Sequence, residues 1–145
     1  MSAPSRLRYE VRAELSAGGR AVVQAGSTAI SFDASAEPES TLPGPADLLA
    51  AALAACLSKN IERFSHILEF RYRRAMVRVE VERQQFPPRI AGSHYVIQID
   101  TEESDRRLEL LHLNLRRHGT ITNTVAASGE LSGELTRWRD PAEPG

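Results

Sequence analysis

The chain has 145 residues, of which 41% are hydrophobic and 26% are charged, and its formal net charge is −1. These values fit a soluble globular domain with its own core, and they indicate no basic face for a nucleic-acid partner. The longest apolar run, from Leu48 to Leu57, is too short to cross a bilayer, and the N-terminus carries no secretory signal. We therefore expect a cytoplasmic protein with no nucleic-acid and no membrane partner.

The N-terminal part of the chain has the pattern of short strands. Apolar residues occupy alternate positions from Tyr9 to Leu15, which predicts a half-buried strand. Turn-forming residues separate this segment from two further strands, at 20–24 and 28–32. A meander of three strands is expected, followed by a polar loop at 34–43.

The most unusual segment runs from Leu48 to Phe64, and Pro45 before it can sit in the first turn of a helix. It contains strong helix formers without a breaker, and its N-terminal half is apolar on every side. This predicts a central helix that is buried all round, either in the domain or at a subunit interface. Asp47 lies near the positive end of this helix, which favours a carboxylate. Cys56 and Asn60 are one turn apart on the same face.

The C-terminal half predicts two more strands, a helix and a final strand. Residues 70–86 alternate between apolar and charged, and a hairpin partner follows around Tyr95 to Ile99. Ser104 is the expected N-cap of a helix from Asp105 to His118.

Gly119 is the expected C-cap of that helix. One or two helical turns follow it, and the last strand is expected at 130–138. The order βββ-α-ββ-α-(α)-β gives an α+β fold. We expect one domain over residues 1–138 and a disordered tail at 139–145.

Cys56 is the only cysteine of the chain. A single cysteine excludes an intrachain disulfide and a multi-cysteine zinc site. His66, His94 and His112 are scattered, and we expect them at the surface or at the rim of a site rather than in a metal cluster. No metal site is therefore expected from these residues.

Two segments resemble the osmotically inducible protein C and organic hydroperoxide resistance (OsmC/Ohr) family. GPADLLAAALAACLSKNIERF, at 44–64, resembles the family's central-helix signature, which leads through small residues to a cysteine. RRHGTITNTVAAS, at 116–128, is similar to the second motif, where the family has another cysteine. The resemblance implies an OsmC/Ohr-like fold with a buried central helix, and an intertwined homodimer with active sites at the subunit interface.

In the peroxidase branch of this family, the central-helix cysteine attacks a hydroperoxide and an arginine stabilises its thiolate. The resemblance therefore implies that no metal and no bound organic cofactor is needed. Cys56 matches that cysteine, and Arg20 matches the arginine. The second, resolving cysteine aligns with Gly119 or the adjacent His118, so the chain resembles an OsmC-like branch that lacks it. The glutamate that orients the arginine aligns with Ala46, and the nearest carboxylate, Asp47, is about 100° further round the helix.

The chemistry requires a thiolate, because a thiol is a poor nucleophile. A cysteine in an apolar helix needs a nearby cation to ionise, and Arg20 or Lys59 could supply it. Asn60 either hydrogen-bonds within the core or lines the pocket. His118 is either a proton donor or a complement to the helix end. Residues 123 and 124 are expected to pack beside the central helix.

The sequence is compatible with three functions. The first is a thiol-dependent organic hydroperoxide reductase for oxidative stress defence, in which Cys56 reduces a small hydrophobic hydroperoxide and an external thiol reductant resolves it. The second is a non-catalytic module that binds a small apolar ligand at the dimer interface, with Cys56 only lining the pocket. The third is a redox sensor that uses oxidation of Cys56 as its signal.

Overall fold

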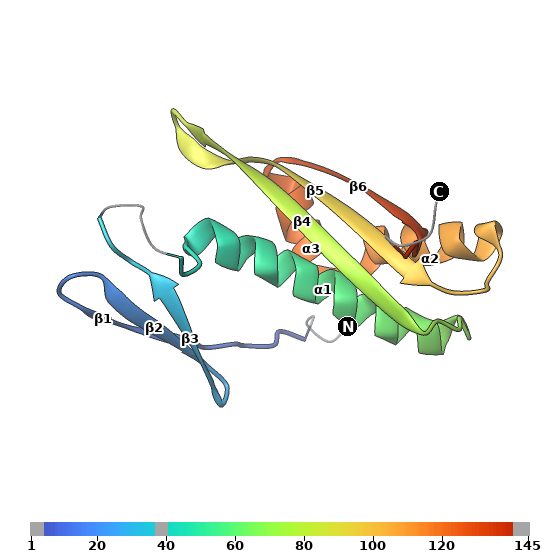
Figure 1. Cartoon of the computed structure of the whole chain (residues 1–145), viewed down its shortest axis with the longest axis horizontal. Coiled ribbons are helices and arrows are strands. Elements are labelled where there is room, and N and C mark those ends of the chain that lie inside the picture. The colour runs from blue at the N-terminus through green and yellow to red at the C-terminus, as the bar shows by residue number, and fades with distance from the viewer. Residues whose placement is uncertain (1–4, 37–40, 141–145) are drawn as a thin grey trace. The chain divides into compact units, whose positions relative to one another are not determined.

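The computed structural model describes residues 5–36 and 41–140 of the chain. The chain divides into two compact units, Met1–Leu48 and Leu49–Gly145 (Figure 1). The loop expected at 34–43 lies partly outside the described residues. The same holds for the tail expected at 139–145, of which only residues 139 and 140 are described.

The first unit is the predicted three-stranded meander. Strands β1 (Arg12–Ser16), β2 (Arg20–Ala25) and β3 (Thr28–Asp33) pair antiparallel in the order β1-β2-β3. Tight turns join them because Gly18, Gly19 and Gly26 adopt positive φ angles that other residues rarely adopt. The hairpins of the meander are therefore fixed by local sequence.

Burial of the first strand was predicted wrongly. β1 begins at Arg12 rather than near Tyr9, and all its residues are exposed. Tyr9 and Leu15, two of the alternating apolar residues, are 87% and 68% exposed. Among the described residues of this unit, only Ala21 is buried. Alternation identifies an apolar face, but it does not supply the surface that covers that face.

Helix α1 (Pro45–Ile67) is the predicted central helix. Its buried residues, Leu53, Leu57, Asn60, Ile61 and Phe64, recur at helical spacing on one face. Burial on all sides, as expected from the alanine-rich half, does not occur within the single chain. There, Leu49 is 39% exposed.

The second unit contains a mixed sheet in the order β4-β5-β6. Strands β4 (Arg74–Gln85) and β5 (Pro88–Asp100) form an antiparallel hairpin, as predicted. Strand β6 (Glu130–Arg137) then runs parallel to β5, with Ile97 opposite Leu135. A parallel pair needs a crossover connection, and helices α2 (Asp105–His118) and α3 (Thr120–Ser128) provide it.

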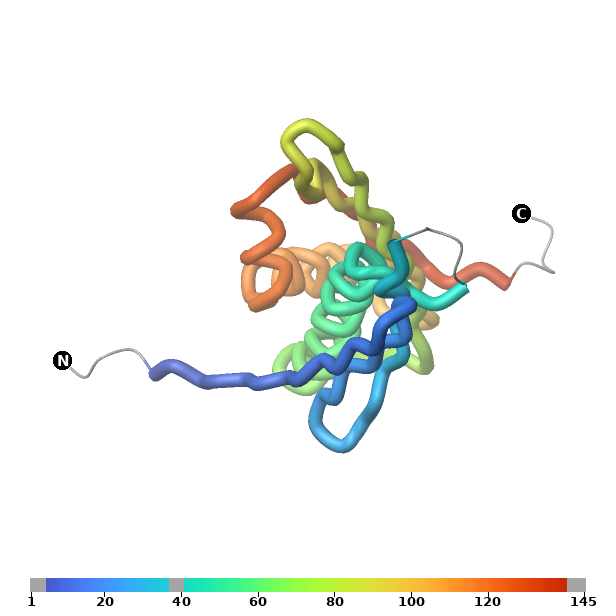
Figure 2. The backbone as a smooth tube through the Cα atoms, turned by 90° about the vertical axis from the view of Figure 1, so that its left-hand side faces the viewer, coloured from blue at the N-terminus to red at the C-terminus, as the bar shows by residue number. Residues whose placement is uncertain are grey.

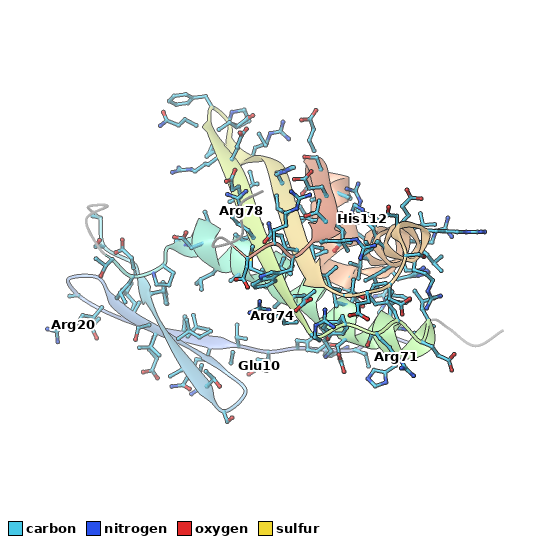
Figure 3. All side chains as sticks on the ribbon, turned by 45° about the vertical axis from the view of Figure 1, so that its right-hand side comes forward. Glu10, Arg20, Arg71, Arg74, Arg78 and His112 are labelled. Carbon is cyan, nitrogen blue, oxygen red and sulfur yellow. The ribbon has the colours of Figure 1, made fainter. Side chains whose placement is uncertain are left out.

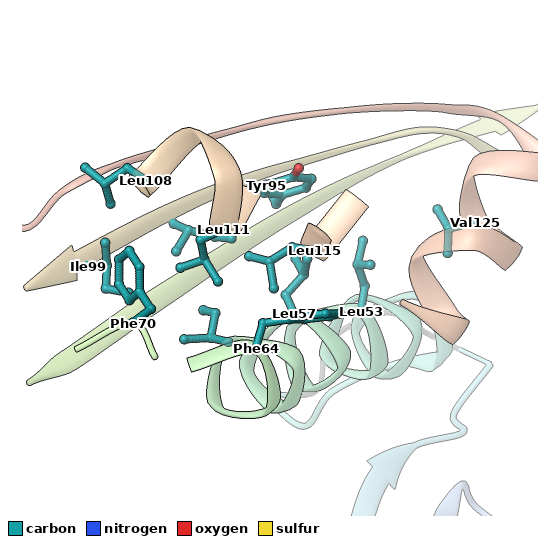
Figure 4. Close-up of a cluster of buried hydrophobic side chains, with 12 residues drawn as sticks. Leu53, Leu57, Phe64, Phe70, Tyr95, Ile99, Leu108, Leu111, Leu115 and Val125 are labelled. Atoms are coloured by element: carbon teal, nitrogen blue, oxygen red, sulfur yellow. The ribbon is translucent and has the colours of Figure 1, made fainter. Parts of the chain in front are cut away.

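The helices of this unit lie on one side of the β4-β5-β6 sheet (Figure 1). Figure 4 shows the core between them, where Tyr95 and Ile99 of β5 face Leu57 and Phe64 of α1. The inward residues of β5 are spaced by two, as expected for a strand with one buried face. Leu111 and Leu115 of α2 fill the space between sheet and α1, and both are fully buried.

The junction of α2 and α3 is the part of the fold that positions the site. α2 has the predicted bounds, and the Ser104 hydroxyl accepts the N–H of Arg107 as the predicted N-cap. Gly119 ends α2, but its backbone is extended (φ −78°, ψ 126°), not left-handed as in a glycine C-cap. Gly119 is also the N-cap of α3, which continues in a different direction (Figure 2).

Candidate functional site

Cys56 lies in the middle of α1, on the edge of its buried face. Leu53 and Leu57 on either side are buried in the core, whereas Cys56 itself is half-buried. The sulfur is therefore held by a rigid helix without being fully enclosed in the core of the chain. A cysteine that reacts with a solute needs this combination of fixed position and access.

Asn60 approaches the sulfur from one turn further along α1. Its Nδ2 donates to the Cys56 carbonyl oxygen at 3.0 Å and lies 3.6 Å from Sγ. Asn60 is 9% exposed, so this amide is placed inside the unit rather than in solvent. The structure thus brings together Cys56 and Asn60, as the predicted site requires, and the amide can donate to a sulfur that carries charge.

The start of α3 approaches the sulfur from the other side. Thr122 Oγ1 lies 3.8 Å from Cys56 Sγ, and Thr122 is only 1% exposed. A Cβ atom at position 119 would lie 3.3 Å from the same sulfur. Gly119, one of the two positions that the sequence matched to the family's second cysteine, therefore lies directly beside Cys56.

The same junction places the sulfur near the positive end of a helix. The first backbone hydrogen bond of α3 runs from Asn123 N–H to Gly119 O, at 2.8 Å. The N–H groups before it have no partner within the helix, and Gly119 offers no side chain to cap them. Unpaired N–H groups and the helix dipole favour an anion such as a thiolate.

Asp47 and His118 are placed away from the sulfur contacts. The Asp47 carboxylate accepts the Gly44 N–H at 2.9 Å and so caps the start of α1, nine residues before Cys56. That separation is about 13 Å along a helix. His118 is exposed and its ring lies 5.5 Å from that of Phe64, between ring centroids. Both positions have an evident structural role.

Arg20 is the first residue of β2 and lies at the end of the β1–β2 hairpin in the first unit (Figure 3). It is exposed. Cys56 belongs to the second unit, and the role of Arg20 beside its thiolate stays a prediction. Lys59, the local alternative, is exposed on α1.

Sequence reasoning chose the wrong residues of α3. Asn123 and Thr124 are exposed, and their side chains donate to backbone carbonyl oxygens. Thr122 and Val125 are the buried residues of this helix. Counting three and six residues from Gly119 would have identified them, because residues three apart share a helix face.

His112, which was expected at the surface or at the rim of a site, is half-buried. Its Nε2 lies 2.6 Å from the Tyr95 hydroxyl. Burial lowers the pKa of His112, and the Arg116 charge lowers it further. Burial also raises the pKa of Tyr95. Figure 3 shows His112 on α2. This pair satisfies a buried hydroxyl and has no contact with Cys56.

Two classes of site find no support in the described parts of the chain. No helix among the described residues is both long and apolar enough to cross a membrane. Within residues 5–36 and 41–140, no three His, Cys, Asp or Glu side chains are grouped so that they could hold a metal ion.

Known structures share this fold. An OsmC-like protein from Mycoplasma pneumoniae superposes with a TM-score of 0.84 at 14% identity, over 92% of this chain and 100% of that one. An organic hydroperoxide resistance protein OsmC from Legionella pneumophila gives a TM-score of 0.69 at 20% identity, over 92% and 100%. The organic hydroperoxide resistance protein OhrB of Bacillus subtilis gives 0.66 at 15% identity, over 88% and 98%.

These likenesses confirm the α+β, OsmC/Ohr-like fold predicted from the sequence. No curated protein sequence matches the chain. The family model for OsmC-like proteins matches residues 36–132, which is more than half of the sequence and includes both segments that carried the resemblance. The chain therefore belongs to the OsmC-like protein family.

Proposed function

We propose that this protein is a thiol-dependent organic hydroperoxide reductase that works with one cysteine. The observation that carries the proposal is the position of the Cys56 sulfur. It is half-buried and lies 3.6 Å from an amide donor on α1 and 3.8 Å from a hydroxyl in the first turn of α3. The Legionella and Bacillus relatives are organic hydroperoxide resistance proteins, which agrees with this chemistry.

The proposed first step consumes the peroxide. The Cys56 thiolate attacks the terminal oxygen of the hydroperoxide, an S–O bond forms and the O–O bond breaks. The alkoxide that leaves takes up a proton, which gives an alcohol and a sulfenic acid on Cys56. A small hydrophobic hydroperoxide is the proposed substrate.

An external thiol completes the proposed cycle. It condenses with the sulfenic acid to a mixed disulfide and releases water, and a second thiol then frees Cys56 and leaves as the external disulfide. The external reductant is needed because Cys56 is the sole cysteine and position 119, beside its sulfur, is a glycine. A cytoplasmic location, which we infer, would supply such thiols.

Arg20 and a second copy of the chain complete the proposal. Arg20 is the proposed cation for the thiolate, in an intertwined homodimer with the site at the interface. The exposed apolar side chains of the first unit, such as Leu15 at 68%, and Leu49 on α1 support the dimer, because a partner would bury them. The mass in solution should be twice 16.0 kDa. A monomer at working concentration would contradict this part of the proposal.

A non-catalytic module that binds a small apolar ligand at the dimer interface is the second candidate. Two observations favour it. Position 119 lacks a resolving thiol, and the Asp47 carboxylate is occupied in capping α1. Native mass spectrometry after gentle purification tests this candidate, because it would reveal a bound apolar ligand.

Turnover of an alkyl hydroperoxide with a thiol reductant separates the two candidates. The reductase should consume peroxide in proportion to enzyme, with one disulfide of the reductant formed per peroxide. C56S is the control, since it removes the nucleophile and changes little else. If the wild-type protein consumes peroxide no faster than C56S with every thiol tried, the catalytic proposal is wrong and the binding module remains.

A further inference from the structure

Thr122 is the one buried hydroxyl beside the sulfur in the part of the chain that the structure describes. It lies in the first turn of α3 and is 1% exposed. A buried hydroxyl is costly unless it hydrogen-bonds, and its partner is Cys56 Sγ at 3.8 Å. Thr122 and Cys56 are 66 residues apart in the sequence, so the fold itself brings them together.

The neighbouring glycine makes room for this contact. A Cβ atom at position 119 would lie 2.6 Å from Thr122 Oγ1, 2.9 Å from Thr122 Cβ and 3.3 Å from Cys56 Sγ. Because the Gly119 backbone is extended, any residue could adopt its conformation, and the glycine is required for space alone. A cysteine side chain at 119 would need the volume that the Thr122 hydroxyl occupies.

We propose that Thr122 is a positioning residue for Cys56, whose hydroxyl takes the place of the missing second cysteine and donates a hydrogen bond to the thiolate. Its importance for turnover rests on the proposed reductase function. The hydrogen bond itself concerns the thiol alone and can be measured without any peroxide.

The geometry explains why the hydroxyl matters for the charged sulfur. Hydrogen bonds to a charged form stabilise that form. Thr122 donates from α3, and Asn60 Nδ2, 3.6 Å from the sulfur, donates from α1. Two donors, one on α1 and one on α3, hold the sulfur in one position and stabilise its negative charge. The dipole at the start of α3 adds to this stabilisation.

The test is the rate of Cys56 alkylation by iodoacetamide as a function of pH in the full-length, reduced protein. One cysteine per chain makes the signal unambiguous. Thr122→Val keeps the shape and removes the hydroxyl, and Thr122→Ser keeps the hydroxyl. Thr124→Val makes the same chemical change at an exposed position of α3, where the hydroxyl bonds the Thr120 carbonyl.

We expect T122V to shift the alkylation profile toward higher pH, with rates on its acidic side about tenfold lower than those of the wild type. T122S and T124V should follow the wild-type profile. A purely structural role for Thr122 would change stability but leave the pH profile where it is. Superimposed profiles of T122V and wild type would overturn the proposal.

Thermal unfolding of each variant is measured first. If T122V does not fold, the smaller Thr122→Ala replaces it in the same comparison, with the same expected and contradicting results. If T122V shifts the alkylation profile but the wild-type protein does not turn over peroxide, the proposed reductase function is wrong and the hydrogen bond from Thr122 stands. If the protein turns over peroxide but T122V leaves the profile unchanged, the reductase function stands and the proposed role of Thr122 is wrong.

Discussion

The contact between Gly119 and Thr122 predicts a specific coupling in stability. Gly119→Ala adds one methyl group at the α2–α3 junction. With Thr122 in place, the new Cβ would lie 2.6 Å from its Oγ1, whereas ordinary contact begins at 3.4 Å. The neighbours must therefore separate by 3.4 − 2.6 = 0.8 Å in a fully buried place. Closely packed interiors absorb such shifts poorly.

The expected magnitude follows from two opposing effects. Overpacking of this kind costs about 1–3 kcal/mol. Alanine restricts the unfolded chain more than glycine does, which returns about 0.4–1 kcal/mol because the Gly119 backbone suits alanine. G119A should therefore lose about 1.3 kcal/mol of unfolding free energy, which is the difference between the midpoints of these two ranges, about 2 and about 0.7 kcal/mol. In a Thr122→Ala background the Oγ1 overlap disappears, so the same substitution should cost about 1 kcal/mol less.

Urea unfolding of wild type, G119A, T122A and the double variant measures this coupling. Gly92→Ala is the matched control, because a Cβ at position 92 meets its nearest atom only at 3.8 Å and should cost little. If G119A is as stable as the wild type, or costs the same in both backgrounds, the packing described around Cys56 is incorrect.

Two further predictions concern titration. The hydrogen bond to the Glu62 carboxylate, helped by partial burial, raises the pKa of Tyr72 to about 12. The unfolded chain ionises this group near pH 10, so stability should fall as pH rises from about 10 to 12, and Glu62→Gln should return the tyrosinate absorbance transition toward pH 10. Burial lowers the pKa of His112. The unfolded chain therefore takes up the proton first, and the urea midpoint should drop as the pH falls through about 6.5, the ordinary pKa of histidine. His112→Gln should reduce that drop, and an unchanged drop would contradict the assignment.

Local signals predicted the regular elements well. The helix at Asp105–His118 was found with its bounds, because its apolar period, the Ser104 cap and the Gly119 break are all encoded within neighbouring residues. The β2, β3 and hairpin strands followed from alternation and turn residues in the same way. Cys56 and Asn60 lie on one turn of one helix, so their proximity was also predictable.

Contacts between elements that are distant in the sequence could not be predicted from local patterns. Alternation gave no reason for β6 to run parallel to β5, since a strand has the same pattern in either direction. The same limit explains the error at β1, whose apolar residues are exposed in the single chain. The approach of Thr122 to Cys56 spans 66 residues and depends on the packing of α3 against α1, which no local pattern contains.

The proposed reductase requires that the fold keeps the Cys56 sulfur ready to react. The most direct measurement mixes the reduced protein with one equivalent of an alkyl hydroperoxide, without any thiol, and follows the free thiol and the peroxide together. We predict that both disappear at the same rate, one peroxide per chain, and that a thiol added afterwards appears on Cys56 as a mixed disulfide in the intact mass. A thiol titre that stays constant while the peroxide persists, as in C56S, would contradict the account.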